Sequence, residues 1–378
     1  MRIKLVYTDW FQQNRIESGA YGGCGYYRVV KPAEHLKFRA DVFGKLITQK
    51  THSEEMWTKF FKGIDLAVIR HFDNPLAISQ LFGASAYFDI PVIIDMDDNF
   101  IDVPENNPAS EGYYKGSDCE HAFAVAMRHA AGVTVSTKPL KKIYEKYNSN
   151  VVVLPNLNDF KDWPIEATWQ RIPKGKDEIR IIYAGSHTHF DDLQMVMPAL
   201  KEVLDKYPNV KILMAGYMPP FMKKEFGDRV TGIFGTKDWR GYNELLYSLN
   251  ADIAIAPLVN NEFNLCKSHI KWMEYSMYKY PVIASNIGEY KKYIRHRKTG
   301  LLADNKTEVW RDAIIEFIER PRLAKKIASN AFNYIRKNLQ WTQHIQKWET
   351  FYKETAKGGT EKLNEFLRTT TTTSKRDG

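Results

Sequence analysis

The sequence predicts an α/β protein with two doubly wound parallel sheets in tandem. Short apolar runs rich in β-branched residues recur between turn residues, and stretches with helical periodicity separate them. This alternation is typical of parallel βα units. The pattern restarts after a polar segment at 158–178, and a chain of 378 residues is long enough for two domains.

Five runs in the first half are predicted as buried strands because turn residues bound them. They are "IKLVYT" (3–8), "DLAVIRH" (65–71), "PVIIDMD" (91–97), "GVTVST" (132–137) and "NVVVLPN" (150–156). Helical periodicity predicts helices at 118–131 and 138–147, between the later of these strands.

Four further strands are predicted in the second half, followed by helices to about residue 356. These strands are 179–186, 210–216, 252–258 and 281–285. The end, "TTTTTSKRDG", is of low complexity and is expected to be disordered. The expected organisation is a first domain at 1–165, a second at 166–340, a helix at 341–356 packing back on the first domain, and a flexible tail at 357–378.

Composition favours a folded protein of the cytoplasm. Hydrophobic residues make up 44% and charged residues 26% of the chain. Its three cysteines lie far apart without a CxxC spacing, which argues against a disulfide framework or a zinc site. No stretch approaches the roughly 20 apolar residues that cross a bilayer, so no membrane insertion is expected. The composition gives no indication of oligomeric state.

Positive charge is concentrated in the second half. The net charge is +9, yet residues 1–165 carry 19 basic against 20 acidic residues, whereas residues 166–378 carry 35 against 25. An anionic ligand is therefore expected to be held by the second half.

Polar residues and glycines follow the predicted strands. Open parallel sheets bind ligands beyond the carboxyl ends of their strands, and a cleft between two such domains would collect both sets of strand ends. The candidates are His71, Asp95, Asp97, Asp98, Thr137, Asn156, Gly185, Ser186, Gly216 and Ser285.

The stretch "FNLCKSHIKWMEYSMYKYPVIAS" (263–285) places charge on a predicted helix that begins near Lys267. Lys267, Lys271 and Glu274 are spaced by four and three residues, which puts them on one helical face. A helix N-terminus with added lysines suits a diphosphate, and a carboxylate one turn later suits the two hydroxyls of a ribose. From the spacing alone, an exposed ion pair on a solvated helix remains an equal alternative.

The same stretch resembles a known family. Glu274, followed by Pro281 in "PVIAS" and by "NIGEYKKYIRHRKTGLLADN", is similar to the donor-binding half of GT-B glycosyltransferases of the large retaining family 4 type. Residues 133–156 and 179–216 are similar to the end of that family's first domain and the start of its second. The resemblance implies an acceptor-side first domain, a nucleotide-sugar-binding second domain and transfer with retention.

Carried over by position, Glu274 matches the second glutamate of the family's E-x7-E motif and would bind the donor ribose. The first glutamate falls on Cys266, where this sequence departs from the motif. Lys267 or Lys271 would neutralise the diphosphate, a role that the family commonly gives to an Arg/Lys pair. Ser268, and Ser186 after Gly185, would donate hydroxyl hydrogen bonds to the same phosphates.

In "AYGGCGYYRV" (20–29), Gly22 and Gly23 stand where the family often has a glycine pair near the donor phosphates. Glycines permit close approach of the backbone, and Arg28 could reach an anion. An ordinary loop is the alternative.

The stretch "IIDMDDNF" (93–100) admits two interpretations. It resembles the metal-binding DxD motif of the GT-A fold, in which paired carboxylates hold a divalent cation. It also aligns with the GT-B strand that ends in His-Asp, which would bring Asp97 and Asp98 near the donor sugar as acceptor-orienting groups or general bases. We expect the second role, and no required cofactor.

In "GSHTHFDD" (185–192), His187 and His189 with the two aspartates could bind zinc, but no further ligand pattern supports this. The aspartates more simply cap the following helix, and His189 is expected to contact the donor or the acceptor.

The predicted activity is transfer of a hexose or pentose from a nucleotide sugar, such as a UDP- or GDP-sugar, to an acceptor hydroxyl. The basic, aromatic-interleaved segment 289–298 would suit DNA, and some compact GT-B enzymes of bacteriophages glycosylate hydroxymethylated bases. Glycan, lipid-linked and small-molecule acceptors remain open. So do a non-catalytic nucleotide-sugar-binding protein and an epimerase or phosphorylase on the same fold.

Overall fold

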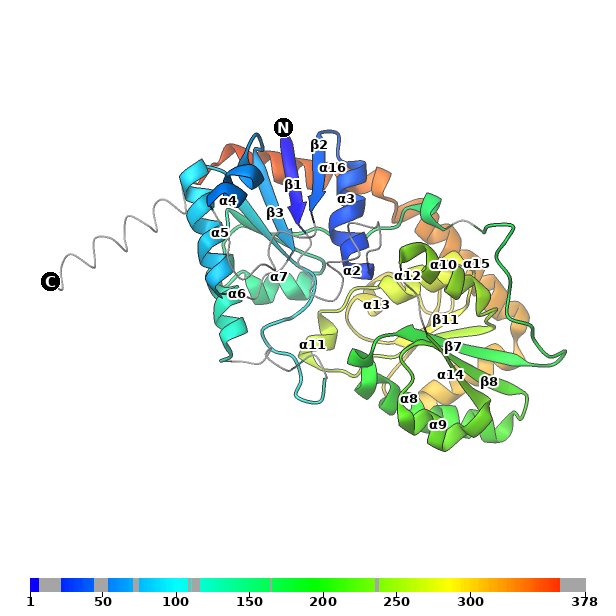
Figure 1. Cartoon of the computed structure of the whole chain (residues 1–378). Coiled ribbons are helices and arrows are strands. Elements are labelled where there is room, and N and C mark those ends of the chain that lie inside the picture. Colours follow the sequence, from blue (N-terminus) through cyan, green and yellow to red (C-terminus); the bar gives the residue numbers. More distant parts are fainter. Residues whose placement is uncertain are drawn as a thin grey trace. The chain divides into compact units, whose positions relative to one another are not determined.

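The computed structural model describes residues 1–6, 22–43, 54–70, 75–107, 110, 116–163, 165–234 and 238–360. The chain forms two compact units (Figure 1). The first comprises the described residues of 1–103 and 111–156 and those from 341 onward, and the second those of 104–110 and 157–340. Each unit contains a six-stranded sheet in which every pairing is parallel, which confirms the predicted fold class.

The sheet of the first unit has the strand order β2-β1-β3-β4-β5-β6. Its strands are β1 (Arg2–Val6), β2 (Arg39–Phe43), β3 (Leu66–Arg70), β4 (Val92–Met96), β5 (Gly132–Val135) and β6 (Val151–Val153). Its helices are α2 (Gly23–Gly25), the π-helical turn η1 (Tyr26–Val30), α3 (Lys31–His35), α4 (Glu54–Phe61), α5 (Pro75–Phe88), α6 (Asp118–His129), α7 (Lys138–Tyr144) and α16 (Trp341–Lys357). The last helix, α16, packs against α3 and β3.

The sheet of the second unit has the order β12-β11-β10-β7-β8-β9. Its strands are β7 (Ile179–Gly185), β8 (Val210–Gly216), β9 (Val230–Ile233), β10 (Ile253–Ala256), β11 (Val282–Ser285) and β12 (Leu301–Ala303). Its α-helices are α8 (Phe190–Lys206), α9 (Pro220–Phe226), α10 (Trp239–Ser248), α11 (Glu262–Leu265), α12 (Ile270–Met277), α13 (Gly288–Tyr293), α14 (Thr307–Glu319) and α15 (Pro321–Asn338). Among the described residues of this unit, 3-10 turns are η3 (Phe160–Asp162), η4 (His187–His189) and η5 (Gly227–Arg229).

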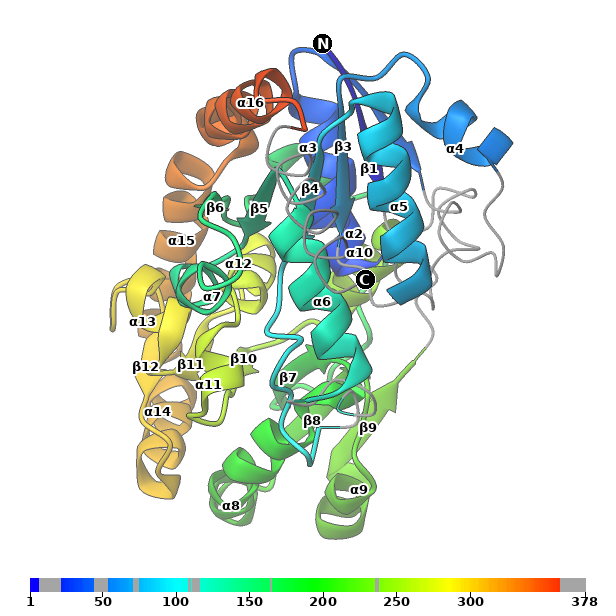
Figure 2. The ribbon, with the colours of Figure 1, turned by 90° about the vertical axis from the view of Figure 1, so that its left-hand side faces the viewer.

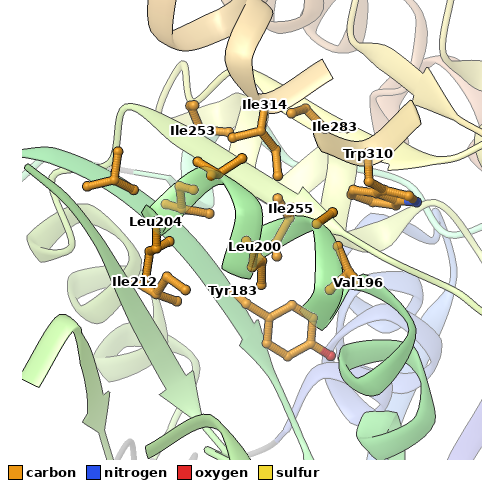
Figure 3. Close-up of a cluster of buried hydrophobic side chains, with 14 of the residues drawn as sticks. Tyr183, Val196, Leu200, Leu204, Ile212, Ile253, Ile255, Ile283, Trp310 and Ile314 are labelled. Carbon is orange, nitrogen blue, oxygen red and sulfur yellow. The ribbon is translucent and has the colours of Figure 1, made fainter. Parts of the chain in front are cut away.

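A continuous apolar core covers one face of the second sheet. Val196 and Leu200 of α8 and Trp310 of α14 pack on strand residues such as Ile212 and Ile255 (Figure 3). These strand positions are fully buried, so their β-branched runs follow from burial on both faces of a parallel sheet. The helix α12 packs on β10 and β11, and α15 runs beside α12 (Figure 2).

Three strands escaped prediction, namely β2, β9 and β12. All three lie at sheet edges, where a strand can be short and polar. A predicted helix start was also wrong: α12 begins at Ile270, three residues after Lys267. His71 and the tail beyond residue 360 lie outside the described residues.

None of the helices within the described parts of the chain is both long and apolar enough to cross a membrane.

Candidate functional site

One buried aspartate links two turns at the carboxyl edge of the second sheet. Asp192, in the first turn of α8, accepts hydrogen bonds from the backbone N–H of Val259 (2.6 Å) and from Asn264 Nδ2 (2.8 Å). Its second oxygen lies 2.7 Å from His189 Nδ1. The turns after β7 and β10 are thereby fixed to α11. The predicted capping of α8 by the aspartates is not observed, because His189 occupies the N-cap position without a side-chain cap.

Lys271 reaches the end of β7 from the first turn of α12. Its Nζ donates to the Ala184 carbonyl over 2.9 Å and lies 5.2 Å from the centre of the Tyr183 ring. Burial lowers the pKa of Lys271 to about 8, although Glu274 acts in the opposite direction. The ammonium group is therefore close to the strand end, and burial makes its charged form costly.

Tyr275, one turn after Lys271, fixes the same strand end. Its hydroxyl accepts from the N–H of Ala184 (2.8 Å) and donates to the Ala184 carbonyl (3.3 Å). The β7 end is thus held at a set distance from α12. Burial raises the pKa of Tyr275, which keeps its hydroxyl neutral.

Glycines are required where β7 and β8 end side by side. Gly216 has φ +93°, and a Cβ there would lie 2.5 Å from the Gly185 carbonyl oxygen. A Cβ at Gly185 would lie 2.5 Å from the hydroxyl of Tyr183. These positions explain the glycines by packing. A ligand contact of Gly185 stays a prediction.

Glu274 is buried on α12, next to the phenol of Tyr242 from α10. The Tyr242 hydroxyl donates to Glu274 Oε2 over 2.7 Å. Only 4% of the Glu274 surface is exposed. The alternative of an ion pair on a solvated helix is therefore wrong for this residue.

Lys267 and Ser268 lie in the turn between α11 and α12, at intermediate exposure. The Nζ of Lys267 lies 4.2 Å from the centre of the Phe263 ring. Cys266, at the departure from the family motif, is the fully buried C-cap of α11. Lys267 therefore does not share a helical face with Lys271 and Glu274, contrary to the sequence prediction.

His189 is a neutral histidine at the N-terminus of α8. Burial, followed by the charge of Lys271, lowers its pKa to about 4, although Asp192 acts in the opposite direction. Because a carboxylate only accepts, the Asp192 contact assigns the proton to Nδ1 and makes Nε2 an acceptor. Nearby, Ser186 Oγ and Thr188 Oγ1 are hydrogen-bonded at 2.7 Å.

The first unit places its charged strand-end residues in ion pairs. Arg28 Nη2 contacts Asp95 Oδ1 at 2.6 Å, with both side chains buried, and its Nη1 donates to the Leu154 carbonyl. The guanidinium also lies 4.9 Å from the Trp348 ring of α16. This geometry gives Arg28 a structural role and argues against the predicted contact with a donor anion.

Asp97 and Asp98 directly follow β4. Asp97 is paired with Arg70 Nη2 at 3.0 Å, and both side chains are buried. Asp98 accepts from Asn99 N–H through Oδ1, and its carbonyl accepts from the Tyr144 hydroxyl. No group of three or more potential metal ligands occurs among the residues whose placement the structure describes.

Gly22 and Gly23 begin the helical segment that runs through α2, η1 and α3. Gly22 is the N-cap of α2, and a Cβ at Gly23 would meet no atom within 4 Å. Packing within the unit therefore does not require glycine at position 23. The π-helical turn that follows is a feature often found at functional sites.

Sequence reasoning missed Tyr242, Asn264 and the linking role of Asp192. Tyr242 lies 32 residues before its partner, and no spacing rule connects the two. For Asn264, "NNEFN" carried a usable signal, since Asn261 caps the short helix α11 by accepting from the N–H of Asn264.

Comparison with known proteins finds a family model that matches part of the second unit. Residues 178–320 match the family described as "Glycosyl transferases group 1". This range contains Gly185, His189, Lys271 and Glu274. No curated protein sequence matches the chain.

Several solved structures share the fold across nearly the whole chain. A sucrose-phosphate synthase from Thermosynechococcus elongatus has TM-score 0.67 at 15% identity, covering 94% of this chain and 99% of that chain. The HepE protein of Anabaena in complex with UDP-glucose has TM-score 0.61 at 13% identity, covering 93% and 99%. A glycosyltransferase from Rickettsia africae has TM-score 0.59 at 15% identity, covering 94% and 98%. The two-sheet fold is therefore that of GT-B glycosyltransferases, and the second unit matches glycosyl transferases group 1.

Proposed function

We propose that the protein transfers a sugar from a nucleotide diphosphate sugar to an acceptor hydroxyl, with retention of configuration. The observation that carries this proposal is that one helix, α12, presents both Lys271, which contacts the end of β7, and the buried carboxylate of Glu274. Both lie inside the range that matches glycosyl transferases group 1. A UDP-sugar is the first donor to test, since the HepE structure was solved with UDP-glucose.

Lys271 would stabilise the departing diphosphate. The bond between the anomeric carbon and the diphosphate oxygen breaks, negative charge develops on that oxygen, and a nearby ammonium stabilises it. The pKa of Lys271, lowered to about 8, would rise again on binding the diphosphate, because an opposite charge favours the protonated form. Lys267, Ser268, Ser186 and Gly185 would add donors around the phosphates.

Glu274 would accept hydrogen bonds from the ribose hydroxyls, and the neutral His189 would accept one from a substrate hydroxyl through Nε2. In the first unit, Asp97 and Asp98 would orient the acceptor or assist removal of its proton. The proton of the acceptor hydroxyl moves to the leaving phosphate or to such a carboxylate, and the new glycosidic bond forms at the anomeric carbon. Gly22 and Gly23 would admit the donor phosphates close to the backbone.

A basic surface of the second unit supports DNA as the acceptor. α15 carries five basic residues and no acidic one. The guanidinium of Arg295 lies 5.1 Å from the Tyr334 ring, and Lys326 and Lys337 lie on the Tyr334 side of α15 by helical periodicity. All three basic side chains are exposed, and such a surface suits a phosphate backbone.

The test is a transfer assay with radiolabelled UDP-, GDP- and ADP-sugars against hydroxymethylated DNA, unmodified DNA and a glycan mixture. We expect release of the nucleotide diphosphate with one donor and label in the hydroxymethylated DNA. Label in the glycan mixture alone would contradict DNA as the acceptor but would still support transferase activity. Binding of a nucleotide sugar without release on any acceptor would favour the non-catalytic binder.

A further inference from the structure

The carboxylate of Glu274 is oriented by a neutral donor that comes from another helix. Tyr242 Oη lies 2.7 Å from Glu274 Oε2. A phenol contact differs from an ion pair because it fixes the direction of the carboxylate without cancelling its charge. Such a carboxylate stays a strong acceptor for hydroxyl donors.

The helix that carries Tyr242 is fastened on both sides of this residue. Asp238 caps α10 by accepting from the N–H of Gly241 over 2.7 Å. Asn243 Nδ2 donates to the Asp162 carbonyl over 2.6 Å. The Trp239 ring packs edge-on against Trp163 at 5.3 Å between ring centres. The phenol therefore approaches Glu274 from a fixed support.

We propose that Tyr242 is a positioning residue for the donor nucleotide, holding the Glu274 carboxylate in the orientation that receives the ribose hydroxyls. This inference rests on the proposed function, since it assigns the ribose to Glu274. It assigns Tyr242 a role in ground-state binding of the nucleotide, exerted through Glu274.

The experiment measures how strongly the protein distinguishes a ribose from a ribose without hydroxyls. UDP and 2′,3′-dideoxy-UDP are titrated calorimetrically into the full-length wild type and Tyr242→Phe. In the wild type, the dideoxy compound should bind about 10–100-fold more weakly, as expected for loss of hydrogen bonds to a charged group. In Tyr242→Phe, affinity for UDP should fall roughly 3–10-fold, and that for the dideoxy compound should stay unchanged.

Tyr247→Phe is the matched control. Tyr247 lies on the same helix, and its ring packs against Trp169 and Tyr278. The Tyr247→Phe substitution should leave the affinities for UDP and for 2′,3′-dideoxy-UDP unchanged. A double variant, Tyr242→Phe with Glu274→Ala, should bind UDP no more weakly than Glu274→Ala alone, because Tyr242 acts through Glu274.

The outcomes separate this inference from the function on which it rests. If the wild type binds UDP and Tyr242→Phe keeps the full discrimination against the dideoxy compound, the positioning role is rejected while the donor site stands. Equal weakening of both compounds would indicate a general structural effect and would also reject the role. If the wild type binds none of UDP, GDP and ADP, both proposals fall together.

Discussion

The two units use charge at their strand ends in different ways. At the first sheet, carboxylates meet arginines of the same unit: Asp95 pairs with Arg28, and Asp97 with Arg70. At the second sheet, Lys271 is held by a backbone carbonyl, and Glu274 meets a phenol. The two carboxylates of the first unit therefore meet cationic partners, whereas these two residues of the second unit contact neutral groups. The difference fits our proposal that the second edge binds a charged ligand, whereas the buried Arg28 of the first unit stabilises the fold.

The largest expected effect comes from breaking the buried pair of the first unit. Arg28→Ala leaves Asp95 as a buried charge without its guanidinium, and this should lower the free energy of unfolding by about 3–5 kcal/mol. Urea denaturation measures this loss in the free energy of unfolding. Arg39→Ala, which removes an exposed pair with Asp41, is the control and should cost less than about 1 kcal/mol. Equal effects of both substitutions would contradict a structural role for Arg28.

The next effect concerns catalysis by the second unit. Lys271→Ala should reduce kcat by roughly two orders of magnitude, because one group that stabilises the developing charge is lost. Steady-state release of the nucleotide diphosphate measures it. Circular dichroism must show a folded protein, and Lys201→Ala on the exposed face of α8 should keep the wild-type kcat. A kcat within twofold of wild type in Lys271→Ala would remove this lysine from the mechanism.

The pH dependence follows from the same lysine. Burial places the pKa of Lys271 near 8 in the unliganded protein, and only the protonated form attracts the diphosphate. The value of kcat/KM should therefore be constant below about pH 7 as far as this group is concerned, and should fall above about pH 8. Lys271→Arg should remove this alkaline decline, since a guanidinium stays charged. A decline that persists in Lys271→Arg would assign the titration to another group.

The smallest effect is expected at the glycine pair of the first unit. Gly23→Ala should change the free energy of unfolding by less than about 1 kcal/mol, because a Cβ meets open space at this helix start. Thermal denaturation measures it. In contrast, Gly216→Ala should destabilise clearly, since the Cβ would meet the Gly185 carbonyl and the backbone has φ +93°. Comparable losses at both positions would mean that Gly23 is needed for packing.

Interior strands were predictable, whereas three of the four edge strands, β2, β9 and β12, were not. The runs at 179–186 and 210–216 coincide closely with β7 and β8 because both faces of a central parallel strand are buried. The edge strand β2, "RADVF", carries two charged residues, and β12 has only three residues. Neither gives a long apolar run, so periodicity does not distinguish them from loops.

For the candidate site, the sequence predicted the shared helix of Lys271 and Glu274 but not the contacts that these side chains make. The spacing of Lys271 and Glu274 placed them correctly on one helix. Their roles depend on Ala184 and Tyr242, which are 87 and 32 residues away from them along the chain. Arg28 shows the opposite case, since an arginine near a glycine pair suggested an anion site until the fold brought Asp95 against it.

The most direct test of the account is a calorimetric titration of UDP-glucose into the wild-type protein and Glu274→Ala, with GDP- and ADP-glucose as further donors. We expect one of these donors to bind the wild type at a single site and Glu274→Ala to bind it about 10–100-fold more weakly, as loss of a charged acceptor implies. Equal affinity in both proteins would contradict the assignment of the donor to the second sheet's carboxyl edge.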